Sequence, residues 1–228
     1  MEAPLANALR RILIAEIPTV AIEKVEMWQN TSIIPDENLA HRMGLIPLAI
    51  NPRLFELKEE GKHYDDKNSV RFKLHVACTK KVPGAPASLN NTEDEEKLYN
   101  NPNVYSGDLE WIPIGDQAER FEREGIDPPK PLLDDILIAK LRPGQEIEME
   151  LICEKGIGKT HAKWSPVCTA YYRNLPDIRF KAPIEGDDAL ALKKLCPMGV
   201  FDIEDIGKVR TSVVKNSEKC TTSRECVR

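Results

Sequence analysis

The sequence predicts an α+β protein in which a mostly antiparallel β unit is inserted between an N-terminal helix and strand and a second mixed segment. Residues 1–18 show the spacing of an amphipathic helix, and residues 70–78 and 146–153 alternate apolar and polar side chains as half-buried strands do. The chain of 228 residues is 41% hydrophobic, which supplies a core for one large domain or two small ones. We place the insert at residues 51–169.

The first helix organises the N-terminal segment. Pro4 fits the first helical turn, where a missing N–H is harmless, and Pro18 ends the helix by restricting the residue before it. One side of the helix carries an apolar stripe at i, i+4, i+7 and i+8. The stripe consists of Leu5, Leu9, Ile12 and Leu13.

The opposite side of this helix mixes polar, cationic and apolar residues: Asn7, Arg10, Arg11 and Ile14. Arginine beside an apolar side chain is favoured at protein–protein interfaces. A single exposed isoleucine is also normal on a protein surface. The helix alone leaves a docking face and an ordinary surface equally open.

The segment after Pro18 is expected to continue as strand, short helix and extended exit. Residues 19–29 alternate in two phases, which predicts a bulge near Glu23 and Lys24. Asp36 is placed to cap a helix over residues 37–43, and Gly44 to end it.

Within the insert, further strands are expected at 109–114 and 136–139, with a long exposed loop over 83–97. The strand over 146–153 should turn its glutamates to water. Beyond the insert, a helix is expected over 187–195, followed by short strands within 200–206 and 208–214.

Composition narrows the classes of function. A net charge of −5 argues against direct binding of nucleic acid, which requires a basic surface. No apolar run approaches the roughly 18 residues of a membrane span, and no leader is visible. The six cysteines are scattered without a CxxC pair, which predicts an intracellular protein with reduced thiols.

The segment Gly156 to Thr160 ends in Gly-Lys-Thr, like a phosphate-binding P-loop. The full motif needs a glycine five residues before Gly158, where this chain has Cys153. It also needs a following helix, whose early growth Pro166 blocks. We expect a turn between antiparallel strands here, with nucleotide binding as a distant alternative.

Other candidate chemistry is weak. Cys153, His161 and Cys168 are too widely spaced for a usual zinc site. His41 has no serine or cysteine spaced to form a nucleophile–base pair with it. The sequence therefore predicts no catalytic residue and no metal or cofactor site.

Three stretches together carry a family resemblance: residues 6–13 (ANALRRIL), 36–48 (DENLAHRMGLIPL) and 161–178 (HAKWSPVCTAYYRNLPDI). In order and spacing they resemble the α-like subunits of cellular RNA polymerases. Residues 98–121 and 134–148 are most similar to the larger α-like subunit shared by RNA polymerases I and III. The RNA polymerase II counterpart typically carries clustered zinc-binding cysteines in its insert, and this chain has none.

The resemblance implies an α-subunit N-terminal-domain-like dimerisation domain, discontinuous over residues 1–50 and 170–228, interrupted by the β-rich insert. It also implies a non-catalytic nuclear scaffold, present in nucleolus and nucleoplasm. This scaffold pairs with a smaller α-like subunit, and the heterodimer carries the two large catalytic subunits during rRNA, 5S rRNA and tRNA synthesis.

Residue by residue, the resemblance makes Asn7, Arg10 and Arg11, with Ile14 alongside, the face toward the second-largest subunit. The stripe opposite becomes the dimerisation core. His41 and Arg42 match the same assembly region less closely.

Two departures from the family predict a fragment lacking both ends. Family members usually have at least one strand before the first helix, and they continue beyond the stretch that corresponds to residues 223–225. The alternatives are the equivalent subunit of RNA polymerase II without its zinc and, more distantly, a nucleotide-binding protein using Gly156 to Thr160.

Overall fold

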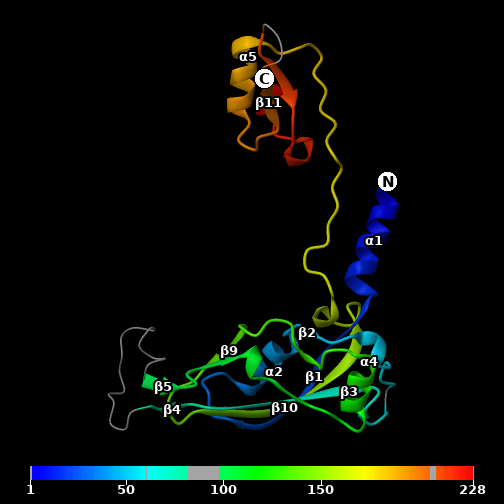
Figure 1. The fold of residues 1–228 in the computed structure, drawn as a ribbon, viewed down its shortest axis with the longest axis vertical. Coiled ribbons are helices and arrows are strands. Elements are labelled where there is room, and N and C mark those ends of the chain that lie inside the picture. Colours follow the sequence, from blue (N-terminus) through cyan, green and yellow to red (C-terminus); the bar gives the residue numbers. More distant parts are fainter. Residues whose placement is uncertain (1, 60, 82–97, 206–208, 228) are drawn as a thin grey trace. The chain divides into compact units, whose positions relative to one another are not determined.

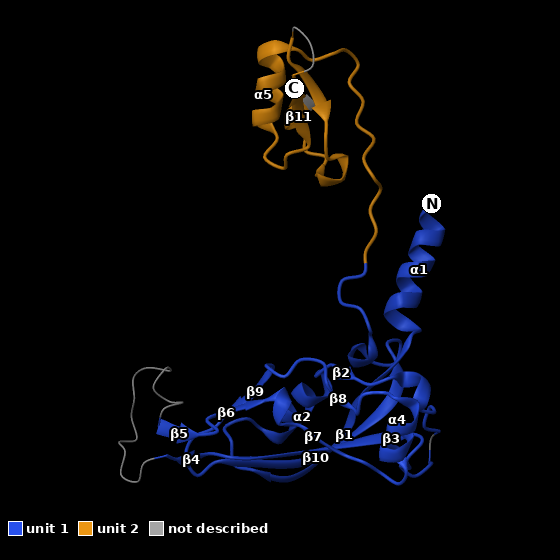
Figure 2. Ribbon diagram, in the orientation of Figure 1, with its two compact units in different colours: residues 1–170 blue, residues 171–228 orange. Residues whose placement is uncertain are grey.

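The computed structural model describes residues 2–59, 61–81, 98–205 and 209–227. Contacts divide the chain into two compact units, residues 1–170 and 171–228 (Figure 2). Residues 1–50, which the sequence assigns to a dimerisation domain, are grouped with the insert. Their membership of one domain with residues 170–228 stays a prediction.

The helices and longer strands of the first unit are labelled in Figure 1 and Figure 2. They are α1 (Ala3–Ala15), β1 (Pro18–Asn30), α2 (Asp36–Gly44), β3 (Ser69–Ala77), β7 (Glu110–Ile112), α4 (Gln117–Glu124), β9 (Leu137–Lys140) and β10 (Glu146–Ile157). Short pieces complete it: β2 (Leu48–Ala49), η1 (Pro52–Leu54), β4 (Thr79–Lys80), β5 (Tyr99–Asn100), β6 (Asn103–Tyr105), η3 (Ser106–Asp108), β8 (Lys130–Pro131) and η4 (Ala162–Trp164).

A four-stranded antiparallel sheet in the order β1-β10-β3-β7 is the centre of this unit. The chain therefore brings its first strand beside a strand that begins more than a hundred residues later. The register of β1 against β10 shifts between Ile22 and Lys24, so the predicted bulge is confirmed. A second shift lies between Met27 and Gln29.

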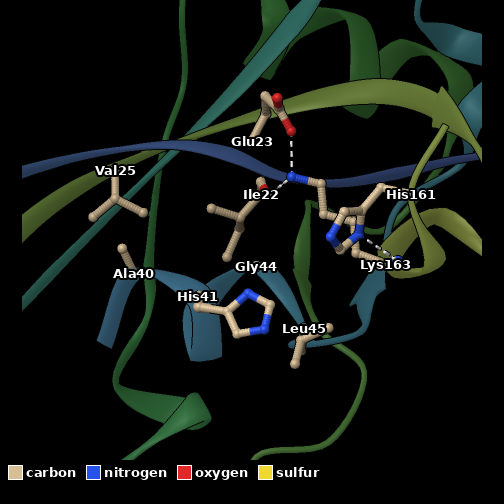
Figure 3. Close-up of a pocket in the computed structure, with 9 residues that line it drawn as sticks. All are labelled: Ile22, Glu23, Val25, Ala40, His41, Gly44, Leu45, His161 and Lys163. Carbon is tan, nitrogen blue, oxygen red and sulfur yellow. Dashed lines mark hydrogen bonds and ion pairs between the residues drawn. The ribbon is translucent and has the colours of Figure 1, made fainter. Parts of the chain in front are cut away.

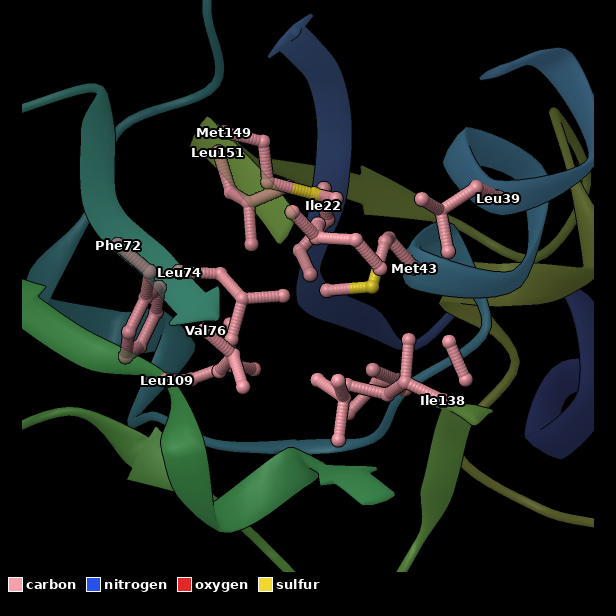
Figure 4. Packing of buried hydrophobic residues seen from close by; sticks show 14 of the residues in the cluster. Ile22, Leu39, Met43, Phe72, Leu74, Val76, Leu109, Ile138, Met149 and Leu151 are labelled. Carbon is pink, nitrogen blue, oxygen red and sulfur yellow. The ribbon is translucent and has the colours of Figure 1, made fainter. Parts of the chain in front are cut away.

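One face of the sheet is buried, and alternation along the strands decides which side chains lie there. Phe72 and Leu74 of β3 and Met149 and Leu151 of β10 are fully buried. Helix α2 and strand β9 cover this face, because Leu39 and Met43 of α2 and Ile138 of β9 belong to the same hydrophobic core (Figure 4). The core thus joins residues from both sides of the predicted boundary at residue 50.

The other face of the sheet corrects one expectation. The glutamates of β10 are only partly exposed, because β3 presents two cationic side chains and a histidine beside them. The pairs are Arg71–Glu150 (3.2 Å), Lys73–Glu148 (2.8 Å) and His75–Glu146 (2.7 Å). The hydrogen bond from Lys73 lowers the pKa of Glu148. Cross-strand pairing, not hydration alone, satisfies these carboxylates.

The start of α2 also differs from the prediction. Asp36 is the first helical residue rather than the cap, and Pro35 holds the N-cap position without a side-chain hydrogen bond. The Asp36 carboxylate accepts a hydrogen bond from Asn30 Nδ2 at 2.6 Å. An acidic residue in the first turn still favours the helix through the macrodipole. Gly44 is the last helical residue rather than the stop after the helix, because Leu45 holds the C-cap position.

The remaining predicted strands of the insert are present as β7, which is shorter than predicted, and β9, which has the predicted length but begins one residue later. Helix α4 was not predicted. Its Gln117 is buried and donates from Nε2 to the backbone oxygens of Asp66 (2.8 Å) and Ser69 (2.7 Å). The predicted loop over 83–97 lies outside the described residues.

The second unit contains the predicted helix, α5 (Gly186–Leu195), and the two strands, β11 (Phe201–Glu204) and β12 (Thr211–Val214), which pair antiparallel. Two single turns follow, η5 (Ser217–Lys219) and η6 (Glu225–Val227). Asp202 joins the elements, because its carboxylate receives Lys193 Nζ from α5 and Lys215 Nζ after β12, both at 2.7 Å. Among the described helices of both units, none is long and apolar enough to cross a membrane.

Candidate functional site: the first helix and its surroundings

Helix α1 forms where the sequence places it, and no residue of it is buried. The apolar stripe is largely open to solvent: the exposed fractions are 57% for Leu5, 48% for Leu9, 43% for Ile12 and 41% for Leu13. An isolated helix of this length is marginal in water, and most helices gain their stability by packing an apolar face. Within the described residues of the first unit, no other element covers this stripe.

The opposite side of α1 contains an internal hydrogen-bonded pair. Arg10 donates to Asn7 Oδ1 from Nε at 3.2 Å and from a terminal nitrogen at 2.9 Å. Arg11 is exposed, while Ile14 is partly buried near the end of the helix. The structure thus brings Asn7 and Arg10 together and leaves the Arg11 guanidinium accessible to another molecule.

The carboxyl end of α1 lies against the turn that follows β10. The Lys159 amide donates to the Ala15 carbonyl at 2.9 Å, which satisfies one of the helix's last carbonyls. Directly after the helix, β1 begins at Pro18 opposite Ile157 of β10. The helix is therefore attached to the sheet at its base.

A second feature is a pocket of about 270 Å³ between β1, α2 and the segment around η4 (Figure 3). The His41 and His161 rings meet edge to face in it, with centroids 6.4 Å apart. Lys163 pairs with Glu23 and donates to the Ile22 carbonyl at 3.0 Å. The residues lining this pocket include no serine, threonine or cysteine, so His41 has no nucleophile to activate there.

Arg42, also singled out in α2, faces a different neighbour. Its guanidinium donates to the Leu137 carbonyl of β9 at 2.8 Å. This hydrogen bond ties α2 to the insert. The two residues that the sequence grouped together, His41 and Arg42, thus border different parts of the surface.

The P-loop-like segment has no phosphate-binding architecture. Gly156 lies in β10, paired with Thr19, so only residues 158–160 form the turn. The turn leads to the single turn η4 and not to a second strand, which corrects the predicted hairpin. A P-loop requires a helix at this position, and its N-terminus would complete the phosphate cradle.

The two cysteines near this segment differ in their surroundings. Cys153 is completely buried, and burial raises the pKa of its thiol, which disfavours the thiolate that binds metals. His161 and Cys168 are exposed.

One group that sequence reasoning missed has the geometry to hold a cation: His75, Glu146 and Glu148. The available signal was that residues 70–78 alternate apolar with basic side chains and residues 146–153 alternate apolar with acidic ones. A sequence does not show the register in which these two strands pair. The His75 imidazole and Glu146 already pair at 2.7 Å, and Lys73 neutralises Glu148. These contacts favour a cross-strand ion-pair ladder over a metal site.

Comparison with known proteins defines the class. The RNA polymerase Rpb3/RpoA insert domain matches residues 21–167, well over half of the chain. Together with the antiparallel sheet and the helix that precedes it, this match shows that the chain belongs to the family of RNA polymerase subunits carrying this domain.

Individual relatives make the assignment more specific. The chain is 45% identical to DNA-directed RNA polymerases I and III subunit RPAC1 of Homo sapiens, over the whole chain and 64% of that protein. It is 48% identical to the subunit of the same name from Dictyostelium discoideum, over the whole chain and 61% of that protein. Identity is lower, 39%, to the DNA-directed RNA polymerase II subunit rpb3 of the same organism, over 97% of the chain and 68% of that protein.

Proposed function

We propose that this chain is the larger α-like subunit shared by RNA polymerases I and III, acting in the nucleus as a non-catalytic assembly scaffold. The observation that carries the proposal is identity of 45% and 48% along the entire chain to subunits named for both enzymes. The chain spans less than two thirds of the length of these relatives, so the partners of the whole protein belong to the proposal.

In this role, α1 serves two partners. The uncovered stripe of Leu5, Leu9, Ile12 and Leu13 is the core of pairing with the smaller α-like subunit, because burial of such a stripe supplies affinity. The face formed by Asn7, Arg10, Arg11 and Ile14 docks on the second-largest subunit, since an accessible arginine beside apolar surface suits an interface.

The domain organisation follows the same proposal. Residues 1–50 and 170–228 together build the dimerisation domain, and the largest subunit joins the platform that the heterodimer provides. Transcription by both enzymes then depends on this subunit for assembly, without a catalytic contribution from its own residues. Both the nucleolus, for rRNA, and the nucleoplasm, for 5S rRNA and tRNA, are its places of action.

Affinity purification of the full-length protein from its native cells tests this function. We expect mass spectrometry to identify the smaller α-like subunit and the largest subunits of RNA polymerases I and III in comparable amounts. Recovery of the RNA polymerase II largest subunit alone would contradict the proposal. It would assign the chain to the RNA polymerase II subunit instead, to whose Dictyostelium form it is 39% identical.

A further inference from the structure

The glycines of the P-loop-like segment have a different role in the structure from phosphate binding. A Cβ atom on Gly158 would lie 2.1 Å from the Ile14 carbonyl oxygen and 3.4 Å from Ala15 Cα. The backbone of the last turn of α1 thus lies directly on Gly158. Its φ angle is not in the left-handed region, so space alone, and not backbone conformation, requires glycine here.

The neighbouring residue completes this contact. The Lys159 amide donates to the Ala15 carbonyl at 2.9 Å, immediately beside the close approach at Gly158. The pairing of β1 with β10 begins three residues after Ala15. The carboxyl end of α1 is therefore fixed both by the Lys159 hydrogen bond and by the start of β1. We name Gly158 and Lys159 the helix seat.

Gly156, two residues before Gly158, makes room for a side chain that connects η4 to the same strands. A Cβ atom on Gly156 would lie 2.4 Å from the indole of Trp164, so the indole occupies the space beside this glycine. Trp164 is buried and donates from Nε1 to the Glu154 carbonyl at 3.1 Å. Its own carbonyl accepts from Thr19 Oγ1 at 2.7 Å, so η4 is bound to the start of β1.

We propose that Gly158 is a positioning residue for assembly, because it sets the direction in which α1 leaves the sheet. This proposal rests on the proposed function. A helix of 13 residues is about 20 Å long, so a tilt of about 10° at its base moves the far end by about 3.5 Å. Leu5 and Asn7 lie about 15 and 12 Å from the base, so the same tilt moves them by about 2 to 3 Å from the surfaces that they are to meet.

The test is Gly158→Ala in the full-length protein, examined by amide hydrogen exchange and by affinity purification. We expect exchange of the Lys159 amide to accelerate at least tenfold and recovery of the second-largest subunits to fall at least fivefold. Amides of β3 and β10 within the sheet should keep their protection. Gly125→Ala is the matched control: it adds a methyl group at a strained φ of 63° after α4, with no atom within 4 Å, and should leave recovery unchanged.

Three outcomes would overturn the proposal. In the first, the Lys159 amide exchanges freely in the wild-type protein, which requires no variant to fold. In the second, Gly158→Ala keeps that amide protected. In the third, the seat opens while recovery of polymerase subunits matches the wild type. Failure of the wild-type protein to recover any polymerase subunit would instead refute the proposed function, and exchange at Lys159 would still decide whether the seat exists.

Discussion

Arg10 and Arg11 are neighbours in sequence, but the structure gives them different surroundings. Arg10 is partly buried and is held by the side chain of Asn7, two contacts that order its guanidinium before any partner binds. Arg11 is exposed. An exposed charge contributes little to the fold, yet it can contribute substantially to binding once a partner removes it from water.

Charge reversal at Arg11 separates these two effects. Arg11→Glu should change the free energy of unfolding by no more than about 0.5 kcal/mol, as exposed substitutions usually do. Binding to the second-largest subunit should weaken by about 2 kcal/mol, or about 30-fold. Arg123→Glu, an exposed charge reversal on α4, is the control for the measured affinity. Unfolding of the Arg11 variant, or equal binding by both variants, would disprove the assigned face.

Asp202 gives a pH dependence to the second unit. Hydrogen bonds from Lys193 and then Lys215 hold the pKa of its carboxyl group well below the ordinary 3.8. A depressed native pKa means that the stabilising contribution is complete above about pH 4 and is lost as pH falls further. We expect amide exchange in β11 and β12 to accelerate on acidification below pH 4.

The variant Asp202→Asn checks the cause of this dependence. It should already show faster exchange in β11 and β12 at pH 7, and its difference from the wild type should vanish in acid. Asp177→Asn removes the same charge from an exposed pair with Arg179 and should leave the exchange rates unchanged. An acid dependence that persists in the Asp202 variant would show that another group causes it.

At the scale of elements, the sequence predicts those helices and strands whose apolar residues recur at a regular spacing. Helix α1 and strands β1, β3 and β10 follow their patterns of apolar residues. Helix α5 forms where predicted, but it buries Ala189 while Leu190 and Leu195 are exposed. Helix α4 was missed because only one large apolar residue, Phe121, marks its buried side, and because Gln117 is buried through hydrogen bonds rather than hydrophobicity. The two-residue strands β2 and β8 are too short to show alternation, and their partners alone define them.

The residues on each face of α1 could be predicted from the sequence, but the contact that attaches α1 to the sheet could not. The faces of α1 follow from a helical wheel, whereas the helix seat depends on a contact between residues far apart in the chain. The Gly156 and Gly158 spacing suggested a ligand, since a sequence does not show what fills the space beside a glycine. In this structure, Trp164 and the end of α1 fill it.

At the scale of the whole molecule, the core of the first unit is fully buried, whereas the apolar stripe of α1 is exposed to solvent. The sheet, α2 and β9 enclose fully buried side chains such as Phe72 and Leu74, while the stripe on α1 stays open. Apolar stripes of this kind are normally covered in a native assembly. The central claim of the proposed function is that a smaller α-like subunit covers this stripe.

Sedimentation of the full-length protein mixed with the smaller α-like subunit tests this claim most directly. We predict a 1:1 complex for the wild type and for Leu133→Asp, a control on another exposed leucine. Leu9→Asp should abolish the complex because it places a charge in the paired core, while the unfolding free energy of the protein alone changes by less than about 1 kcal/mol. A Leu9→Asp protein that forms the complex as tightly as the wild type would contradict the account.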